Sequence, residues 1–344
     1  MKSVLITGAS GLIGSHVSFA LRAMGYDVHE VGRSALADGG RLAGRIAKID
    51  VVIHLAARIR GEDDIVISEN RAISAALQSI IEASGSQPHV VFSSSINADR
   101  DDAHGQSKRE AEAFFSNWCN TNGCAFTCLI LPHIFGEGGR PNHNSVVSTF
   151  CAMVAAGKQP EIAHDGEIEP LHAQRLADQL VDIIEQAQTG HVTLKGRRMR
   201  VSGMLDRLIA LDERHRRHLL PNLHDPFDLD LFNSYRSYLY PHHYPREGNE
   251  QANLPENDIK TDHLTVAPGE NVTPTIHRRS FRRVMVVEGE AEIVIGKMFN
   301  HGEHVFNLTS SKAQYLDIPT LHPYTINNKG VTPLSMAIWQ SPLI

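Results

Sequence analysis

Residues 1–14 read MKSVLITGASGLIG, a short apolar run that leads directly into a loop with glycine at every third position. The run over 4–6 predicts a buried β-strand. Gly8, Gly11 and Gly14 allow a tight turn and let another molecule approach the bare backbone. The helix predicted next would point its first N–H groups and its partial positive charge at this loop. A strand, a glycine loop and a helix in this order predict a site for the diphosphate of a dinucleotide cofactor.

Strands and helices alternate along the first 160 residues, which is the pattern of a Rossmann-like, doubly wound α/β domain with a parallel sheet. The predicted strands are Val4–Thr7, Asp27–Val31, Val51–Leu55, Val90–Ser93 and Thr127–Leu131. The helical stretches between them lie around residues 15–24, 69–84 and 106–119.

The pattern changes near residue 240. Residues 241–262 are polar and rich in proline, which predicts a linker. Short alternating segments separated by Gly and Asn turns follow, and they predict a small all-β domain. We therefore expect a first domain over 1–240 and a β domain over 263–344. The strands predicted in the β domain are Leu264–Val266, Arg283–Val287, Ala291–Ile295, Gln314–Asp317 and Leu334–Trp339.

The composition is that of a soluble globular protein, with 344 residues, 42% hydrophobic and 21% charged. The net charge of −6 argues against nucleic acid as a partner. No apolar run is long enough to span a bilayer, and the chain opens in its first strand without room for a signal peptide. We therefore expect a cytoplasmic protein without a membrane partner. The four cysteines lack paired C-x-x-C spacing, which favours reduced thiols: Cys119, Cys124, Cys128 and Cys151.

The end of the second predicted strand bears on the choice of cofactor. An NAD site usually has Asp or Glu there, which binds the ribose 2′-hydroxyl. This chain has Arg33 and Ser34, which offer a guanidinium and a hydroxyl to a 2′-phosphate. The pattern favours NADP(H) over NAD. The alternative is that Arg33 is an ordinary solvated arginine.

Three further stretches lie in a recognisable order: IHLAA over 53–57, FSSS over 92–95 and HGQSK over 104–108. In order and spacing they resemble the extended short-chain dehydrogenase/reductase superfamily. In that superfamily a Ser or Thr after the fourth strand hydrogen-bonds the hydroxyl or carbonyl of the substrate. The resemblance assigns this role to Ser94 or Ser95.

The superfamily transfers a proton through a Tyr-x-x-x-Lys pair, whose lysine binds the nicotinamide ribose and lowers the pKa of the tyrosine. Lys108 matches the lysine, but His104 stands where the tyrosine is expected. An imidazole can donate a proton to a developing alkoxide at neutral pH. The alternative is a site that has lost or relocated its proton donor. The residues that the glycine motif and the resemblance place along the cofactor are Gly8, Ser10, Gly11, Leu12, Ile13, Gly14, Arg33, Ser34, Leu55, Ala56, Ala57, Lys108 and Pro132.

A closer resemblance rests on four segments, over 92–98, 105–108, 132–151 and 232–239. They are similar to the bifunctional reductases of capsular polysaccharide and O-antigen synthesis (the CapF type). That family joins an extended dehydrogenase to a C-terminal cupin and makes UDP-N-acetyl-L-fucosamine precursors. Its cupin epimerises a UDP-4-keto-6-deoxy-hexosamine, and its dehydrogenase reduces the ketone with NADPH.

The same resemblance implies which residues face the nucleotide-sugar. Asparagines and an arginine in a loop suit a diphosphate and a uracil, whereas isolated loop residues of these types more often form turns and caps. The implied substrate residues are His133, Arg140, Asn142, Asn144 and Ser145.

A metal-binding cupin presents three histidines and a glutamate to one divalent ion. The matching positions here are Thr275, His277, Arg282 and Tyr324, so one of the four ligands remains. A guanidinium cannot ligate a cation and repels it. We therefore expect no metal, a doubtful epimerase step, and a structural or dimerising role for the β domain, with a homodimer as the assembly.

Four arginines lie close together in the β domain. Two interpretations stay open for them, a solvated strand face and a site for an anion such as a diphosphate. They are Arg278, Arg279, Arg282 and Arg283.

Taken together, the residues and the resemblance predict NADP(H)-dependent reduction of a nucleotide-linked 4-keto-6-deoxy-hexosamine, with UDP as the expected carrier, for a surface polysaccharide. Two alternatives remain. One is a redox-neutral epimerase or dehydratase, and the other is a catalytically impaired protein that binds the cofactor.

Overall fold

A computed structural model describes residues 1–37, 48–219, 221–247, 259–299 and 301–341 of the chain. The chain divides into two compact units. The first comprises Met1–Ile134 and Glu169–Arg197, and the second comprises Phe135–Ile168 and Arg198–Ile344.

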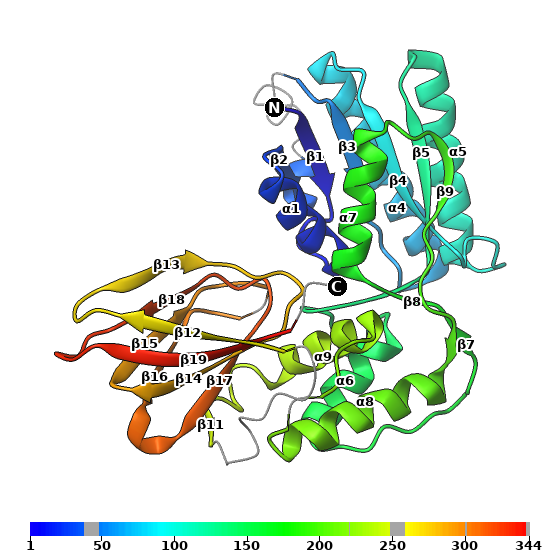
Figure 1. Cartoon of the computed structure of the whole chain (residues 1–344). Coiled ribbons are helices and arrows are strands. Elements are labelled where there is room, and N and C mark those ends of the chain that lie inside the picture. Colours follow the sequence, from blue (N-terminus) through cyan, green and yellow to red (C-terminus); the bar gives the residue numbers. More distant parts are fainter. Residues whose placement is uncertain (38–47, 220, 248–258, 300, 342–344) are drawn as a thin grey trace. The chain divides into compact units, whose positions relative to one another are not determined.

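The first unit contains a six-stranded parallel sheet in the order β2-β1-β3-β4-β5-β9 (Figure 1). Its strands are β1 (Ser3–Thr7), β2 (Asp27–Val31), β3 (Val51–His54), β4 (His89–Ser95), β5 (Phe126–Leu131) and β9 (Gly190–Thr193). The predicted Rossmann-like fold class and its five strands are confirmed. The sequence pattern did not predict β9, because the segment GHVT is short, polar and mostly exposed.

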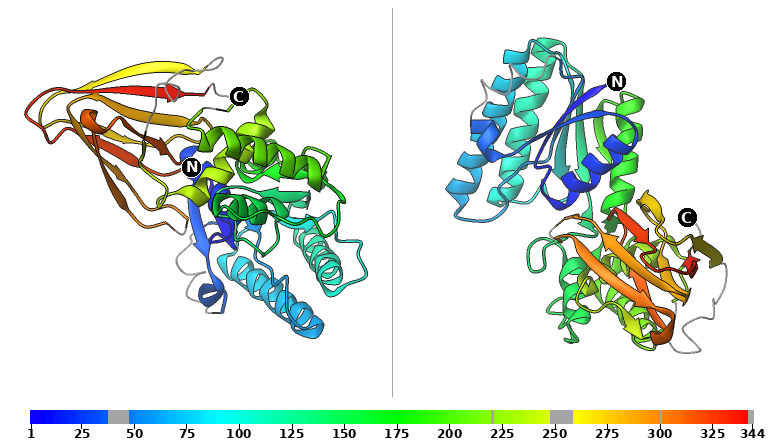
Figure 2. Two further views of the ribbon diagram at one scale, coloured as in Figure 1. Left: turned by 90° about the horizontal axis from the view of Figure 1, so that it is seen from below. Right: turned by 90° about the vertical axis from the view of Figure 1, so that its left-hand side faces the viewer.

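Helices cover both faces of this sheet, as the right-hand view in Figure 2 shows. Helices α1 (Leu12–Ala23) and α7 (Ala173–Glu185) pack on one face, where Val4 and Ile6 are buried. Helices α4 (Asp63–Ser84) and α5 (Ala103–Asn122) pack on the other face, where the alternate residue Leu5 is buried. A short helix, α2 (Arg33–Ala37), follows β2.

The order of the strands fixes where a ligand can bind. From β1 the sheet continues to β2 on one side and to β3 on the other. The connections therefore diverge at the carboxyl ends of β1 and β3. This is the topological switch point at which open α/β sheets bind their ligands.

The second unit combines α-helices with antiparallel strands. The helices are α6 (Val146–Ala155), α8 (Val201–Arg216) and α9 (Pro226–Leu239). Short strand pairs lie near the crossings between the units, namely β6 (His133–Phe135) with β8 (Pro170–His172) and β7 (Glu167–Ile168) with β10 (Met199–Arg200).

The C-terminal strands form two antiparallel sheets, which confirms the predicted all-β region. The five-stranded sheet has the order β11-β17-β14-β19-β12, with bounds Arg246–Glu247, Gln314–Ile318, Arg282–Glu288, Leu334–Gln340 and Lys260–Val266. The four-stranded sheet has the order β13-β18-β15-β16, with bounds Asn271–Thr275, Tyr324–Asn327, Glu290–Ile295 and His304–Thr309.

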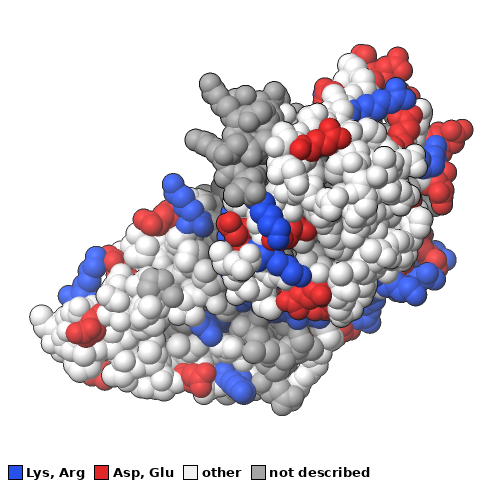
Figure 3. Space-filling model, turned by 90° about the horizontal axis from the view of Figure 1, so that it is seen from above, with Lys and Arg blue, Asp and Glu red and all other residues white. Residues whose placement is uncertain are grey.

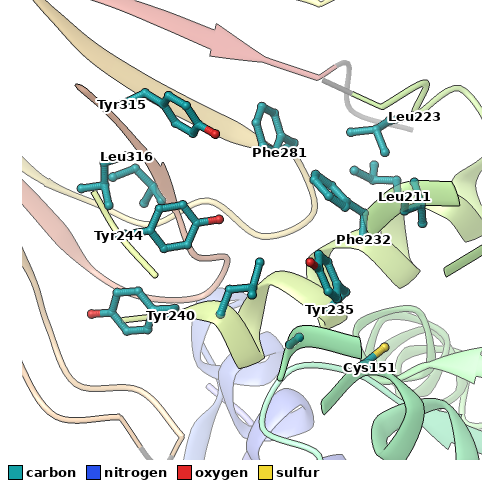
Figure 4. Packing of buried hydrophobic residues seen from close by; sticks show 14 of the residues in the cluster. Cys151, Leu211, Leu223, Phe232, Tyr235, Tyr240, Tyr244, Phe281, Tyr315 and Leu316 are labelled. Atoms are coloured by element: carbon teal, nitrogen blue, oxygen red, sulfur yellow. The ribbon is translucent and has the colours of Figure 1, made fainter. Parts of the chain in front are cut away.

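Aromatic side chains join the helices of the second unit to its sheets (Figure 4). Phe232 and Tyr235 of α9 belong to the same buried cluster as Phe281 and Tyr315 of the β region. The segments 135–168 and 198–239 therefore share a core with the β-strands, so the compact units do not divide at the predicted boundary near residue 240.

The first part of the predicted linker is packed into this unit. Tyr244 is buried, and the strand Arg246–Glu247 pairs with β17. Aromatic residues interrupt the proline-rich stretch and supply the apolar area that holds it in the core. Residues 248–258 of the predicted linker lie outside the described residues.

Charged side chains of both signs are interspersed on the face drawn in Figure 3. None of the helices in the described ranges combines the length and the apolar character that a membrane crossing requires.

Candidate functional site

The loop after β1 is built from glycines that leave no space for a side chain. Gly8 has a φ of +74°, and a Cβ placed on it would lie 2.8 Å from the backbone nitrogen of Ala56. A Cβ on Gly14 would lie 2.3 Å from the carbonyl oxygen of Gly8. These two glycines therefore let α1 and the end of β3 pack directly against the loop.

Gly11 occupies a more open position at the start of α1. A Cβ there would meet only the Gly8 carbonyl oxygen, at 3.3 Å. Gly11 is the N-cap of α1 and provides no side-chain hydrogen bond to the first turn of the helix. Free N–H groups and the partial positive end of the helix dipole are what a diphosphate requires, so these residues fit a dinucleotide. Ser10 is exposed beside Gly11, and Leu12 and Ile13 begin the helix.

The carboxyl ends of β1 and β3 are tied together by side chains. The Thr7 hydroxyl lies 2.7 Å from His54 Nδ1 and accepts a hydrogen bond from the Ala56 N–H at 3.2 Å. Burial, assisted by the charge of Lys108, lowers the pKa of His54 to about 3, so its ring is neutral. This bridge fixes the turn of Leu55, Ala56 and Ala57 next to Gly8.

A second set of hydrogen bonds, which the sequence did not predict, fixes the loop after β3. Asn70 of α4 is buried, accepts a hydrogen bond from the Arg58 N–H at 2.7 Å and donates to the Arg58 carbonyl at 2.8 Å. Its amide thus substitutes for a strand partner just beyond the cofactor loop. The sequence shows only an asparagine within a predicted helix, and its burial, which requires hydrogen-bond partners, is seen in the structure.

Lys108 is buried beneath the end of β4. Its Nζ donates a hydrogen bond to the Ser93 carbonyl at 2.6 Å and lies 5.1 Å from the centre of the Phe92 ring. Burial lowers the pKa of Lys108 to about 8. The ammonium is therefore held by the backbone at the same edge of the sheet as the glycine loop.

His104 lies one helical turn before Lys108. It follows the N-cap Asp102, whose carboxylate accepts a hydrogen bond from the Gly105 N–H at 2.7 Å. A Cβ on Gly105 would lie 2.2 Å from the Arg100 carbonyl oxygen, so the preceding loop packs tightly on the start of α5. Burial, with smaller effects from Lys108 and Arg100, lowers the pKa of His104. Among the residues that the structure describes, none forms a hydrogen bond with the His104 ring, so a substrate can use it.

The two candidate serines lie on opposite faces of β4. Ser94 is buried on the α5 face, the face to which Phe92 of the same strand points. Ser95 follows it and therefore points to the other face. Its hydroxyl oxygen accepts a hydrogen bond from the Asn97 N–H at 3.1 Å, which leaves its own proton to donate. Of the two, Ser95 is the better candidate for a contact with a substrate oxygen.

The residues expected to favour NADP(H) over NAD lie at the start of α2. Arg33 begins α2 directly after β2, and its side chain lies outside the described residues. Ser34 is exposed. Pro132, which follows the strand β5, is buried.

The implied substrate residues are divided between the two units. His133 lies in the first unit, where its Nδ1 accepts a hydrogen bond from the Glu169 N–H at 3.1 Å. Arg140, Asn142 and Asn144 lie exposed in the second unit. Ser145, also there, caps α6 through a hydrogen bond from the Ser148 N–H.

Turn and cap roles are therefore present among the implied substrate residues. Besides the Ser145 cap, Asn142 adopts a φ of +57°. The exposed side chains of Arg140 and Asn144 remain the better candidates for substrate contacts.

The positions that match the cupin ligands form a cluster around a guanidinium. Arg282 donates to the Tyr324 hydroxyl and to the side-chain carbonyl of Gln340. His277 is buried nearby, and burial with the charge of Arg282 lowers its pKa to about 3. Thr275 ends β13 and donates its hydroxyl proton to the Thr273 carbonyl. This donor set does not fit a cation.

Arg283 is not on a solvated strand face, so that interpretation is wrong for this residue. It is fully buried and donates to the Asp317 carboxylate at 2.6 and 3.1 Å. Its guanidinium carbon lies 3.8 Å from the centre of the Tyr315 ring. The carboxylate balances its charge inside the core, which also argues against a site for an external anion.

Comparison with known proteins gives a match to both halves of the chain. Residues 4–193 match the NAD dependent epimerase/dehydratase family, and residues 257–343 match the polysaccharide biosynthesis C-terminal domain. The chain is 22% identical to the UDP-2-acetamido-2,6-beta-L-arabino-hexul-4-ose reductase of Pseudomonas aeruginosa, over 98% of this chain and 94% of that protein.

Two solved structures share the fold. The capsular polysaccharide assembling protein CapF from Staphylococcus aureus has a TM-score of 0.61 and 21% identity, and the match covers 99% of this chain and 96% of that one. The UDP-N-acetylglucosamine 4-epimerase from Methanobrevibacter ruminantium has a TM-score of 0.60 and 18% identity over 69% of this chain and 98% of that one. Because the first match spans residues 4–193, more than half of the 344 residues, the chain belongs to the NAD dependent epimerase/dehydratase family.

Proposed function

We propose that this protein uses NADP(H) to reduce the ketone of a nucleotide-linked 4-keto-6-deoxy-hexosamine, carried on UDP, in the synthesis of a surface polysaccharide. The observation that carries the proposal is the combination of an open glycine loop at the start of α1 with the buried Lys108 at the end of β4. The similarity to a UDP-hexulose reductase along 98% of the chain supports the substrate class. The match of residues 257–343 supports the pathway class.

Each part of the site has a role in this reaction. When bound, the cofactor supplies a hydride to the ketone carbon. The backbone N–H groups after Gly11 hold its diphosphate, and the Lys108 ammonium holds the nicotinamide ribose. Ser95 donates a hydrogen bond to the ketone oxygen and so polarises the carbonyl group. His104 delivers the proton that the oxygen needs once the hydride has been transferred.

The preference for NADP(H) rests on Arg33 and Ser34 at the end of β2. A guanidinium pairs with a 2′-phosphate through charge-assisted hydrogen bonds, whereas no carboxylate is present at this point to bind a 2′-hydroxyl. Arg33→Ala should weaken NADPH binding and leave NADH binding unchanged.

The test follows deuterium from the cofactor to the sugar. Purified protein is mixed with deuterated NADPH, labelled at nicotinamide C4, and a UDP-linked 4-keto-6-deoxy-hexosamine. Absorbance reports NADPH oxidation, and mass spectrometry reports deuterium at C4 of the sugar product. The proposal predicts both signals. It also predicts that Lys108→Met and His104→Ala lower the rate by about 100-fold or more. Conversion of the sugar without net NADPH oxidation would instead identify a redox-neutral epimerase or dehydratase.

One observation favours a second candidate, a cofactor-binding protein without turnover. His104 replaces the tyrosine on which the family's proton transfer relies, and its lowered pKa leaves it neutral near pH 7. In that case NADPH binds, no substrate is reduced, and His104→Ala has no effect. Comparison of the parent protein with His104→Tyr distinguishes the two. A reductase is active in both proteins, whereas an impaired protein is active only after the substitution.

A further inference from the structure

A side-chain cluster on the α5 face of the first unit belongs to neither the cofactor loop nor the β domain. Strands β5 and β9 pair in parallel with Cys128 opposite His191. Facing residues of neighbouring strands point to the same side of a sheet. Helix α5 covers that side and places Glu112 over the pair.

The three side chains converge on one point. Their ligand atoms, which are the sulfur of Cys128, a ring nitrogen of His191 and a carboxylate oxygen of Glu112, all lie within 4.8 Å of one another. The His191 ring lies 2.6 Å from the Glu112 carboxylate. Among the residues that the structure describes, this is the one group in which three His, Cys, Asp or Glu side chains bring their ligand atoms this close together.

The chemistry of the donors selects the ion. A thiolate, an imidazole and a carboxylate are the three ligand types that zinc binds, and three protein ligands leave the fourth tetrahedral position to water. Magnesium and calcium prefer oxygen ligands alone. The sulfur is buried, while the His191 side chain is 65% exposed and the Glu112 side chain 24% exposed. The cluster thus has a shielded soft ligand and a path of entry from solvent.

We propose that Cys128, Glu112 and His191 form a site for Zn²⁺ or a similar divalent ion. The ion displaces the thiol proton of Cys128 and interrupts the direct hydrogen bond between His191 and Glu112. The simpler reading is a surface His–Glu pair that happens to lie above a buried thiol, and the experiment must separate the two.

The position of the cluster links it to Lys108. Glu112 lies one helical turn after Lys108 on α5, and the thiolate form of Cys128 is close enough to raise the pKa of Lys108. A bound dication would therefore add positive charge beside the lysine that holds the nicotinamide ribose in the proposed function. The existence of the site does not depend on that function.

The experiment uses Co²⁺ as a spectroscopic substitute for Zn²⁺ on the full-length protein under reducing conditions. Cobalt bound by a thiolate shows a ligand-to-metal charge-transfer band in the near ultraviolet, and cobalt bound by histidines alone does not. We expect a saturable band that one equivalent of Zn²⁺ removes. Because binding releases the thiol proton, the affinity should rise as the pH rises.

The variants test each ligand. His191→Ala changes an exposed residue on an edge strand, and Glu112→Gln keeps the shape of the side chain. Each should weaken Co²⁺ binding by about tenfold or more. Cys128→Ser should abolish the band; because Cys128 is buried, circular dichroism must show that this variant is folded.

Two matched controls should bind Co²⁺ like the unchanged protein. His29→Ala removes a histidine that likewise pairs with a carboxylate, Asp27, at 3.1 Å, and Cys124→Ser removes a second thiol of the same unit, which is partly buried. No charge-transfer band at saturating Co²⁺, or equal affinity in His191→Ala and His29→Ala, would overturn the proposal.

Discussion

The two units treat their polar groups in opposite ways. In the first unit, the loop around Gly11 leaves helix N–H groups without a side-chain cap, and His104 lacks a hydrogen-bonding partner among the described residues. In the second unit, the guanidinium groups of Arg282 and Arg283 are bonded within the protein, Arg282 to Tyr324 and Arg283 to Asp317. We call donors without a protein partner the open set, because a ligand can bond to them. We call donors that are bonded within the protein the closed set, because they stabilise the fold.

The largest expected effect concerns the closed set. Asp317→Asn leaves the buried Arg283 guanidinium without its counter-charge, which should lower the free energy of unfolding by about 3–5 kcal/mol. Urea unfolding measures this change. The exposed Asp262 on β12 provides the control, and Asp262→Asn should shift stability by less than about 0.5 kcal/mol. Equal stability of the two variants would contradict the structural role of the buried pair.

Acid should reveal the same pair in the unchanged protein. The Arg283 guanidinium lowers the pKa of Asp317 to about 2 against its burial, below the ordinary value of 3.8. A carboxyl group with a lowered pKa stabilises the fold above its unfolded pKa, so this contribution is lost as the pH falls from about 3.8 toward 2. Asp317→Asn should remove this part of the acid dependence.

The next effect concerns the open set. Gly11→Val places a side chain in the space before α1 and meets little of the protein itself. It should weaken NADPH binding by about 100-fold, or about 2.7 kcal/mol, with a small change in stability. Gly14→Val should instead impair folding, because its Cβ would lie 2.3 Å from a backbone oxygen. Equal NADPH affinity in Gly11→Val and the parent protein would show that the loop does not hold the diphosphate.

A smaller effect concerns the proton donor. Burial lowers the pKa of His104 below its ordinary 6.5, so the imidazolium form exists only at acidic pH. If the imidazolium delivers the proton, kcat should fall by up to about tenfold per pH unit as the pH rises above that pKa. A pH profile of kcat measures this dependence. His104→Tyr should shift the decline to higher pH, and an identical profile in both proteins would exclude His104 as the donor.

The smallest expected effect concerns Lys108. Burial lowers its pKa from 10.5 to about 8, so the ammonium form predominates below about pH 8 and is progressively lost above it. NADPH affinity should therefore decline by a few-fold as the pH rises through about 8. Fluorescence titrations from pH 6 to about 9.5 measure the trend. An unchanged affinity across this range would separate the ammonium from cofactor binding.

The strands and the glycine loop of the first unit could be predicted from short stretches of sequence. The apolar runs and the spacing of Gly8, Gly11 and Gly14 predicted the parallel sheet and its loop. The strand Gly190–Thr193 was not predicted, because its sequence is polar and it pairs only at the edge of the sheet, with β5.

Long-range contacts account for what the sequence did not predict. The core shared by α9 and the β-strands depends on packing between aromatic residues that are distant in sequence, such as Phe232 and Phe281. Glu112, Cys128 and His191 come from a helix and two strands, and only the pairing of β5 with β9 brings them together. The proton-donor role of His104 stays a prediction.

Isothermal titration calorimetry of the unchanged protein with NADPH and NADH tests the central claim most directly. The account predicts saturable binding of one cofactor per chain, with NADPH bound more tightly than NADH. Absence of binding heat for both cofactors across several temperatures would contradict it.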